Sequence, residues 1–280
     1  MSLFRRGKKQ SSKHTLQEQH RRKEERKNLL SVSRDFFMQE AYKSLRTNVN
    51  FSLAGDLNRT MVISVTSALQ GEGKSFTATN LAISYAQADQ KVLLVDCDLR
   101  RPKIHTLLQL QNELGLSNVL MDLTLLPSAI VPSGISGLDV LTSGTVPPNP
   151  SELLDSSRMD QLLCQVQEQY DCVILDTPPV NMVTDSAVLA SKVEGVLFVV
   201  RVGVSQRPAV LQAVDQLLYG RGKVLGFVLN GVDLSKPYYG YNRYGYGRYY
   251  GRYGGYGYRS AEQERPPSGG SVPPVPDPIP

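Results

Sequence analysis

The chain has 280 residues, 41% of them hydrophobic, and its 31 Lys and Arg against 26 Asp and Glu give a net charge of +5. This length suits one α/β domain of about 200 residues with tails. We find no run of the roughly 20 apolar residues that span a bilayer and no signal peptide, so we expect neither a membrane-spanning nor a secreted protein. The cysteines lack metal-ligand spacing, and we expect buried, reduced thiols at Cys97, Cys164 and Cys172.

The positive charge is concentrated in residues 1–28, which hold ten Lys or Arg against three Glu. The remaining residues, 29–280, together carry about −2. The arm predicts either a solvated tail or attraction to anionic lipid or an acidic partner, worth about 1 kcal/mol per basic residue near such a surface. It has no interleaved aromatic residues, so we do not expect nucleic acid as a partner.

The next part of the chain alternates between two hydrophobic patterns. Helical spacing of apolar residues predicts helices over residues 35–53, 76–88, 151–169 and 209–219. Short apolar runs predict strands over residues 61–67, 91–95, 138–141, 172–175, 195–202 and 224–232. This alternation is typical of α/β folds in which a mostly parallel sheet has helices on both faces.

The C-terminal part has a different composition. Residues 238–258 contain ten tyrosines, seven glycines and three arginines, which predicts a flexible strip of exposed phenol hydroxyls. The proline-rich end, residues 266–280, is expected to be extended or disordered. We therefore predict a basic tail (1–28), a P-loop domain (29–235), a Tyr/Gly/Arg cluster (236–260) and a disordered tail (261–280).

The turn after the first predicted strand, residues 67–75, reads SALQGEGKS and contains the parts of a P-loop. Glycines let backbone N–H groups wrap a phosphate, a lysine reaches the β- and γ-oxygens, and a serine hydroxyl binds Mg²⁺. Ala68 replaces the first glycine of the usual pattern, but the strand before and the helix after support the P-loop fold. We expect the nucleotide contacts to be Gln70, Gly71, Glu72, Gly73, Lys74, Ser75 and Phe76.

Three carboxylates follow predicted strands: Asp96 and Asp98 after the second strand, and Asp176 after the strand at 172–175. Parallel strands end at one edge of the sheet, where ligands of such folds bind. Any one of these residues alone could cap a helix. Together they predict a cation between the carboxylates and the phosphates.

The loop, the run from Asp96 to Pro102, the sequence DTPP at 176–179, PPNPSELL at 147–154 and the tyrosine cluster resemble the bacterial tyrosine kinases of the capsule and exopolysaccharide type. The resemblance covers roughly residues 35–260. It implies a P-loop protein-tyrosine kinase that uses Mg²⁺ and ATP, phosphorylates itself and regulates polysaccharide synthesis and export. It further implies a cytoplasmic enzyme recruited to the inner face of the membrane by a membrane-anchored adaptor, with a cognate tyrosine phosphatase. The implied phosphoacceptors are Tyr238, Tyr239, Tyr241, Tyr244, Tyr246, Tyr249, Tyr250, Tyr253, Tyr256 and Tyr258.

Phosphoryl transfer depends on positioning and on neutralising charge, which suggests individual roles. Lys74 and the loop amides would bind the phosphates, and Ser75, Asp98 and Asp176 would hold Mg²⁺. Asp96 would orient the tyrosine hydroxyl or accept its proton, although the roles of Asp96 and Asp98 could be exchanged. Two further assignments place Arg100 at the developing charge and Asn230 at the base.

The first predicted helix carries Glu40, Lys43 and Arg46 at a spacing of three, along one face. This pattern predicts an intrahelical ladder of ion pairs. The family resemblance instead implies a contact that assembles a homo-oligomeric ring, with Lys43 where arginine is more common and hence without arginine's planar fork. We expect an unmodified tail of charge +3 to be drawn to an acidic cleft on a neighbour. Phosphates of about −1.5 to −2 each would expel it and dissolve the oligomer.

Two other functions are compatible with parts of the sequence. A partition or division-site switch ATPase would share the fold, but it would carry a signature lysine where this chain has Leu69, and it would lack the tyrosine tail. The Tyr/Gly/Arg strip also superficially resembles RNA-binding low-complexity sequence. Deleting residues 236–280 would separate that role from a kinase, because phosphorylation of an added tyrosine peptide would persist.

Overall fold

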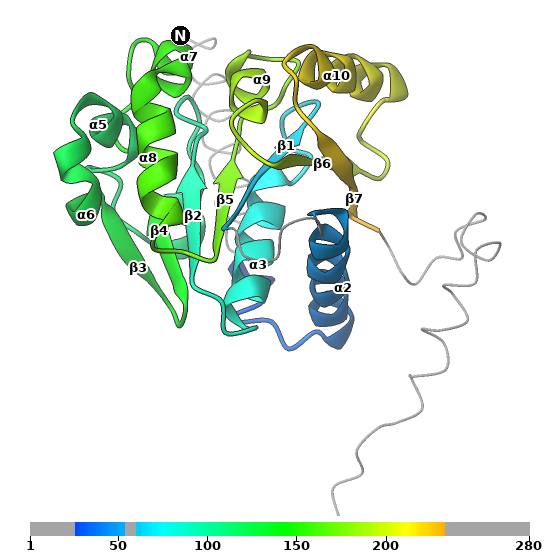
Figure 1. Ribbon diagram of the computed structural model, residues 1–280. Coiled ribbons are helices and arrows are strands. Elements are labelled where there is room, and N and C mark those ends of the chain that lie inside the picture. The colour runs from blue at the N-terminus through cyan, green and yellow to red at the C-terminus, as the bar shows by residue number, and fades with distance from the viewer. Residues whose placement is uncertain (1–25, 54–59, 233–280) are drawn as a thin grey trace, which may run out of the picture. The chain divides into compact units, whose positions relative to one another are not determined.

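The computed structural model describes residues 26–53 and 60–232, and its centre is one seven-stranded sheet (Figure 1). The strand order is β3-β4-β2-β5-β1-β6-β7, and every neighbouring pair is parallel except β3 with β4. The predicted α/β fold with a mostly parallel sheet is confirmed. The strands are β1 (Met61–Ser67), β2 (Val92–Asp96), β3 (Ile130–Ile135), β4 (Leu138–Leu141), β5 (Cys172–Asp176), β6 (Gly195–Arg201) and β7 (Val224–Asn230).

The helices α2 and α3 lie side by side on one face of the sheet (Figure 1). None of the helices within residues 26–53 and 60–232 is long and apolar enough to cross a bilayer. The helices are α2 (Phe36–Leu53), α3 (Lys74–Ala86), α4 (Ile104–Leu108), α5 (Leu116–Met121), α6 (Leu126–Ala129), α7 (Pro150–Asp155), α8 (Ser157–Gln167), α9 (Asp185–Ala190) and α10 (Arg207–Tyr219), with one 3₁₀ turn at Leu123–Leu125.

Successive residues of the central strands supply two separate cores. On β5, Ile174 packs in the core that includes Leu81 of α3, whereas its neighbour Val173 packs in the core that includes Leu162 of α8. Successive side chains of a strand point to opposite faces, so each central strand is buried on both sides. This explains why the central strands read as continuous apolar runs rather than as alternating ones.

One predicted helix is in fact two. The helix expected over residues 151–169 is interrupted at Ser156, whose extended backbone (φ −63°, ψ 154°) separates α7 from α8. The Ser156 hydroxyl donates to the carbonyl of Leu153 at 2.6 Å. Serine competes in this way with helical hydrogen bonds, which is why it favours helix ends over helix interiors.

The edge strand β3 was not predicted from the sequence, because its residues include Pro132, Ser133 and Gly134. Proline is tolerated in a sheet mainly at an edge, and β3 is the edge strand beside β4 in the part of the chain that the structure describes. The prediction for the cysteines was also wrong in one case. Cys97 and Cys172 are buried, but Cys164 is exposed on α8.

Several predictions concern residues outside the described ranges. They include the basic tail up to residue 25, the domain boundaries at 235 and 260, and the proline-rich end. The ten tyrosines expected to accept phosphate also lie outside.

Candidate functional site

The loop between β1 and α3 has the backbone that a P-loop requires. Gly71 and Gly73 adopt φ values of +87° and +99°, which side chains on L residues strongly disfavour. A Cβ atom at Gly73 would lie 1.9 Å from Nδ2 of Asn230, at the end of β7. Glycine is therefore needed at position 73 for its conformation, and a side chain there would also have to displace the amide of Asn230.

The sheet brings the predicted carboxylates to one edge. Strand β5 lies between β2 and β1, and Asp176 is in register with both Asp96 and Val65. The P-loop begins two residues after Val65, at the end of β1. The strand order thus joins segments that are about 80 to 110 residues apart in the sequence.

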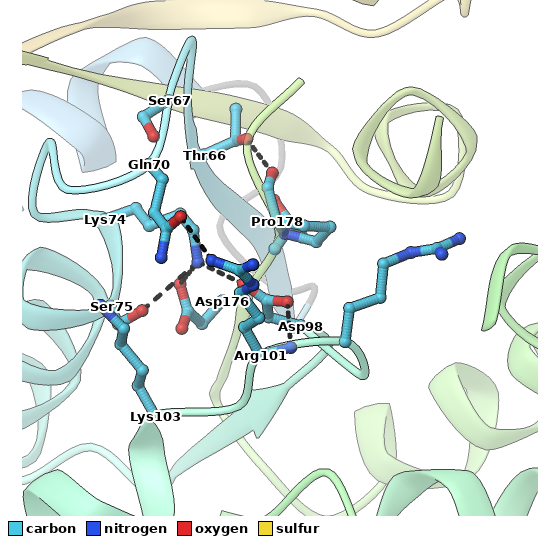
Figure 2. A network of polar contacts seen from close by, with 12 residues as sticks. Thr66, Ser67, Gln70, Lys74, Ser75, Asp98, Arg101, Lys103, Asp176 and Pro178 are labelled. Carbon is cyan, nitrogen blue, oxygen red and sulfur yellow. Dashed lines mark hydrogen bonds and ion pairs between the residues drawn. The ribbon is translucent and has the colours of Figure 1, made fainter. Parts of the chain in front are cut away.

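At this edge Lys74 contacts two of the carboxylates and the hydroxyl of Ser75 (Figure 2). Its Nζ lies 2.8 Å from Oδ2 of Asp98, 3.7 Å from Oδ1 of Asp176 and 3.4 Å from Oγ of Ser75. Burial alone would lower the pKa of Lys74, but the carboxylates of Asp176 and Asp98 more than offset that effect and raise the pKa above its ordinary value. The ammonium group is therefore charged, and the Lys74 side chain is only 9% exposed.

Asp176 is the residue best suited to a cation. Neither of its carboxylate oxygens accepts a hydrogen bond from the described residues, although both are buried. Burial raises the pKa of Asp176, and the charge of Lys74 only partly opposes this. Buried oxygens that accept no hydrogen bond from the described residues, beside Asp98 and the hydroxyl of Ser75, fit Mg²⁺, which prefers oxygen ligands.

Across residues 26–53 and 60–232, no three His, Cys, Asp or Glu side chains form a cluster that could hold a metal by themselves. Mg²⁺ commonly takes one or two carboxylates, keeps several waters and uses phosphate oxygens for the rest. The residues present therefore fit a cation that is held jointly with a nucleotide.

Asp96 is used differently from Asp98. Its Oδ1 accepts the backbone N–H of Asp98 at 3.2 Å, and its Oδ2 accepts those of Lys103 and Ile104 at 3.1 and 3.0 Å. Burial, followed by the nearby charge of Asp176, raises the pKa of Asp96 to about 8. Asp96 thus holds the loop that follows β2 and is itself fully buried.

A cavity of about 310 Å³ opens beside the P-loop. Three predicted site residues do not line it, because Glu72, Asp96 and Asp176 lie behind its surface. The predicted residues that do line it are Gln70, Gly71, Gly73, Lys74, Ser75, Phe76, Asp98, Arg100 and Asn230.

The cavity wall is cationic, and the expectation of an acidic cleft was wrong. Among the described residues that line the cavity, Asp98 is the one carboxylate. A surplus of positive charge suits a polyphosphate rather than an arginine-bearing tail. The lining cations are Lys74, Arg100, Arg101, Lys103 and Arg201.

Three of these cations were missed in the sequence. Arg101 and Lys103 belong to the segment that follows β2, and Arg101 donates to Oε1 of Gln70 at 2.8 Å (Figure 2). Arg201 ends β6, the neighbour of β1, and donates to the carbonyl of Gly71 at 2.8 Å. The sequence did contain a signal for these cations, because each is a basic residue at or after the carboxyl end of a predicted parallel strand.

Arg100 lines the cavity, but its guanidinium group is held by two residues that do not line it. Its guanidinium group makes a two-point contact with the buried carboxylate of Asp185, at 3.0 and 3.2 Å, and also donates to the hydroxyl of Ser151 at 3.0 Å. Ser151 is at the start of α7, and Asp185 is at the start of α9. The bidentate geometry fixes the direction of this guanidinium.

The predicted self-association residues do not act as one unit within the chain. Nζ of Lys43 lies 2.7 Å from Oε1 of Glu40, so this part of the predicted ladder is present. Arg46 instead donates to the backbone carbonyl of Ser84, in α3. The face that the spacing predicted is therefore divided between an exposed ion pair and an arginine that joins α2 to α3.

Known proteins resemble this chain in both sequence and structure. A family model described as an AAA domain matches residues 60–218. The tyrosine-protein kinase YwqD of Bacillus subtilis is 41% identical over 207 residues, which are 74% of this chain and 85% of the relative. The solved kinase domain of the Escherichia coli tyrosine kinase ETK is 40% identical, with a TM-score of 0.68, over 72% of this chain and 78% of that one.

A more distant structure shares the fold alone. The septum site-determining protein MinD of Pyrococcus horikoshii, solved as a complex with Mg-ADP, is 23% identical with a TM-score of 0.53. The match covers 62% of this chain and 72% of that one.

Proposed function

The chain belongs to the bacterial protein-tyrosine kinases, and we propose from this that it transfers the γ-phosphoryl group of ATP to tyrosines of its own C-terminal segment. The observation that carries the proposal is the position of Lys74, whose ammonium group is held between Asp98 and Asp176 at a cationic cavity. An ammonium group fixed in this place can reach the β- and γ-oxygens of a nucleotide on the P-loop.

The binding step uses groups that are already positioned. The amides from Gly71 to Ser75, at the start of α3, bind the phosphates with help from the positive end of the helix dipole. Ser75, Asp98 and Asp176 would hold Mg²⁺, which would neutralise charge that develops on the phosphates. Arg100, oriented by Asp185, contributes positive charge at the cavity wall.

The proton of the attacking tyrosine hydroxyl needs an acceptor, and we assign Asp96 to it. A phenol has a pKa near 10, and a carboxylate whose pKa is raised to about 8 is a better match for that proton than an ordinary one. Asp98 is the second candidate, because it lines the cavity and Asp96 does not.

The acceptor tyrosines follow the cavity wall in the sequence. Asn230 and Gly231 both line the cavity, and Tyr238 is seven residues further along. An extended chain advances about 3.5 Å per residue, so the seven residues span at most about 25 Å. This arrangement supports autophosphorylation as the reaction.

We propose that α2 also assembles the chain into a homo-oligomeric ring through Glu40 and Lys43, with Arg46 supporting the helix from behind. Phosphates of about −1.5 to −2 charge each, gathered on adjacent tails, would repel one another and dissolve the ring. Equal particle masses for the phosphorylated and unphosphorylated chain by light scattering would contradict this.

The cellular setting is a proposal based on the relatives. A membrane-anchored adaptor of the polysaccharide co-polymerase type would recruit the enzyme from the cytoplasm to the inner face of the membrane. The kinase would there regulate capsular or extracellular polysaccharide synthesis, and a cognate tyrosine phosphatase would reverse the modification. A solved chimera named CapA2B2, 38% identical to this chain, supports association with a partner.

The direct test is peptide-resolved mass spectrometry of the full chain after incubation with Mg·ATP, with and without the adaptor's cytoplasmic segment. We expect phosphate within residues 238–258 in the wild type and none in Lys74→Met. ATP hydrolysis without any phosphotyrosine, even with the adaptor, would instead support the switch-ATPase function suggested by the distant fold likeness.

A further inference from the structure

We propose that Glu72 is a positioning residue: its side chain, with Ser205 and Asn230, holds the P-loop in the shape that binds phosphate. We call these three residues the P-loop brace. The inference rests on the nucleotide binding proposed above, and it gives Glu72 a role other than direct contact with the nucleotide.

The Glu72 carboxylate joins two parts of the chain. It is buried, with 1% exposure, although it belongs to the loop that binds an anion. Its Oε2 accepts the N–H of Leu69 at 2.7 Å, at the start of the same loop. Its Oε1 accepts the hydroxyl of Ser205, from the connection between β6 and α10.

Two more hydrogen bonds support this arrangement, one at the carbonyl of Glu72 and one at Ser205. Nδ2 of Asn230 donates to the carbonyl of Glu72 at 2.9 Å, and Oγ of Ser205 accepts the N–H of Arg201 at 2.8 Å. Arg201 and Asn230 are register partners at the ends of β6 and β7. The brace is therefore attached to paired strands, which are more rigid supports than a loop.

The position of this carboxylate has an electrostatic cost, because a buried negative charge near a phosphate site disfavours an anionic ligand. A glutamate there is best explained if it supplies order that outweighs the repulsion. A loop that is ordered before binding loses less conformational entropy when the phosphates arrive. The expected benefit is tighter nucleotide binding, with a smaller effect on the chemical step.

The test is titration of the full-length chain with fluorescent Mg·ADP, together with steady-state kinetics in ATP. Glu72→Ala should weaken ADP binding by about tenfold, the loss of roughly one charge-assisted hydrogen bond, and should affect KM for ATP more than kcat. Glu72→Gln should restore most of the affinity, because an amide can accept from Leu69 and donate to Ser205. Glu168→Ala, an exposed glutamate at the end of α8, is the matched control and should bind as the wild type does.

Ser205→Ala is the second variant, for the case in which Glu72→Ala does not fold, and it should weaken ADP binding in the same direction. A lower melting temperature with unchanged ADP affinity in either variant would show a merely structural role and overturn the brace. A wild-type chain that binds no ADP would overturn the proposed nucleotide site and the brace with it. The two failures are thus distinguishable.

Discussion

Two lysine–carboxylate pairs of nearly equal length lie in contrasting parts of this molecule. At the P-loop, Lys74 and Asp98 are 2.8 Å apart, and their side chains are 9% and 6% exposed. On α2, Lys43 and Glu40 are 2.7 Å apart, and their side chains are 55% and 34% exposed. The first pair faces the candidate nucleotide, and the second lies on the proposed assembly surface.

The difference shows that distance alone says little about what an ion pair does. An exposed pair is solvated and screened, so it contributes about 0 to 1 kcal/mol and its members can exchange partners easily. Removing one member of a buried pair leaves a charge with neither water nor a partner. The buried pair is thus suited to hold a fixed geometry, and the exposed pair to recognise another copy.

The largest expected effect comes from replacing Lys74, and replacing Lys43 in the exposed pair provides the comparison. Lys74→Met should lower the phosphoryl-transfer rate by at least about 10³-fold, because it removes the charge at the β- and γ-oxygens. It should also lower the free energy of unfolding by about 3 kcal/mol at pH 7, measured by urea denaturation. Lys43→Met, the matched control, should change the unfolding free energy by less than about 1 kcal/mol.

The loss of stability in Lys74→Met should depend on pH. Without the lysine, the pKa values of the buried carboxyls, already raised by burial, rise further above their unfolded values. A carboxyl whose folded pKa is raised stabilises the fold below its unfolded pKa, near 4, and loses that effect as pH rises. The variant should therefore lose stability more steeply than the wild type between about pH 7 and pH 9, where Asp96 of the wild type already ionises in the folded state. Equal slopes would contradict the buried-pair interpretation.

An intermediate effect should separate the two neighbouring aspartates within the buried site. Asp98→Asn should raise the Mg²⁺ concentration needed for half-maximal transfer, because it removes a proposed metal ligand. Asp96→Asn should lower kcat by about 10²-fold or more at an unchanged Mg²⁺ requirement, because it removes the proposed proton acceptor. Magnesium titrations of both variants would measure this, and the reversed pattern would exchange the two roles.

The smallest effect belongs to the exposed pair. Lys43→Arg keeps the charge and adds a planar fork, so it should tighten self-association by less than about tenfold. Sedimentation equilibrium at two salt concentrations would measure the change, and high salt should reduce it. Identical association of Lys43→Arg, Lys43→Met and the wild type would exclude this face of α2 as the assembly surface.

The sequence predicted the site best where function demands special residue types next to one another. Gly71, Gly73, Lys74 and Ser75 could be read as a P-loop because a phosphate needs glycine conformations, a cation and a hydroxyl at fixed spacing. It predicted least where a residue acts through a distant partner. Neither Asp185 behind Arg100 nor Ser205 beside Glu72 stands out by its local pattern.

The sequence by itself determined the order of six of the seven strands and of the longer helices, the P-loop and the family, because hydrophobic period and motif spacing are local properties. Only the tertiary structure decided that Asp96 is buried and Asp98 lines the cavity, although the two are separated by one residue. It also decided that Arg46 is bonded to α3 and that the cavity is cationic. The physical reason is that burial, hydrogen-bond partners and local charge are set by segments that meet across the sheet.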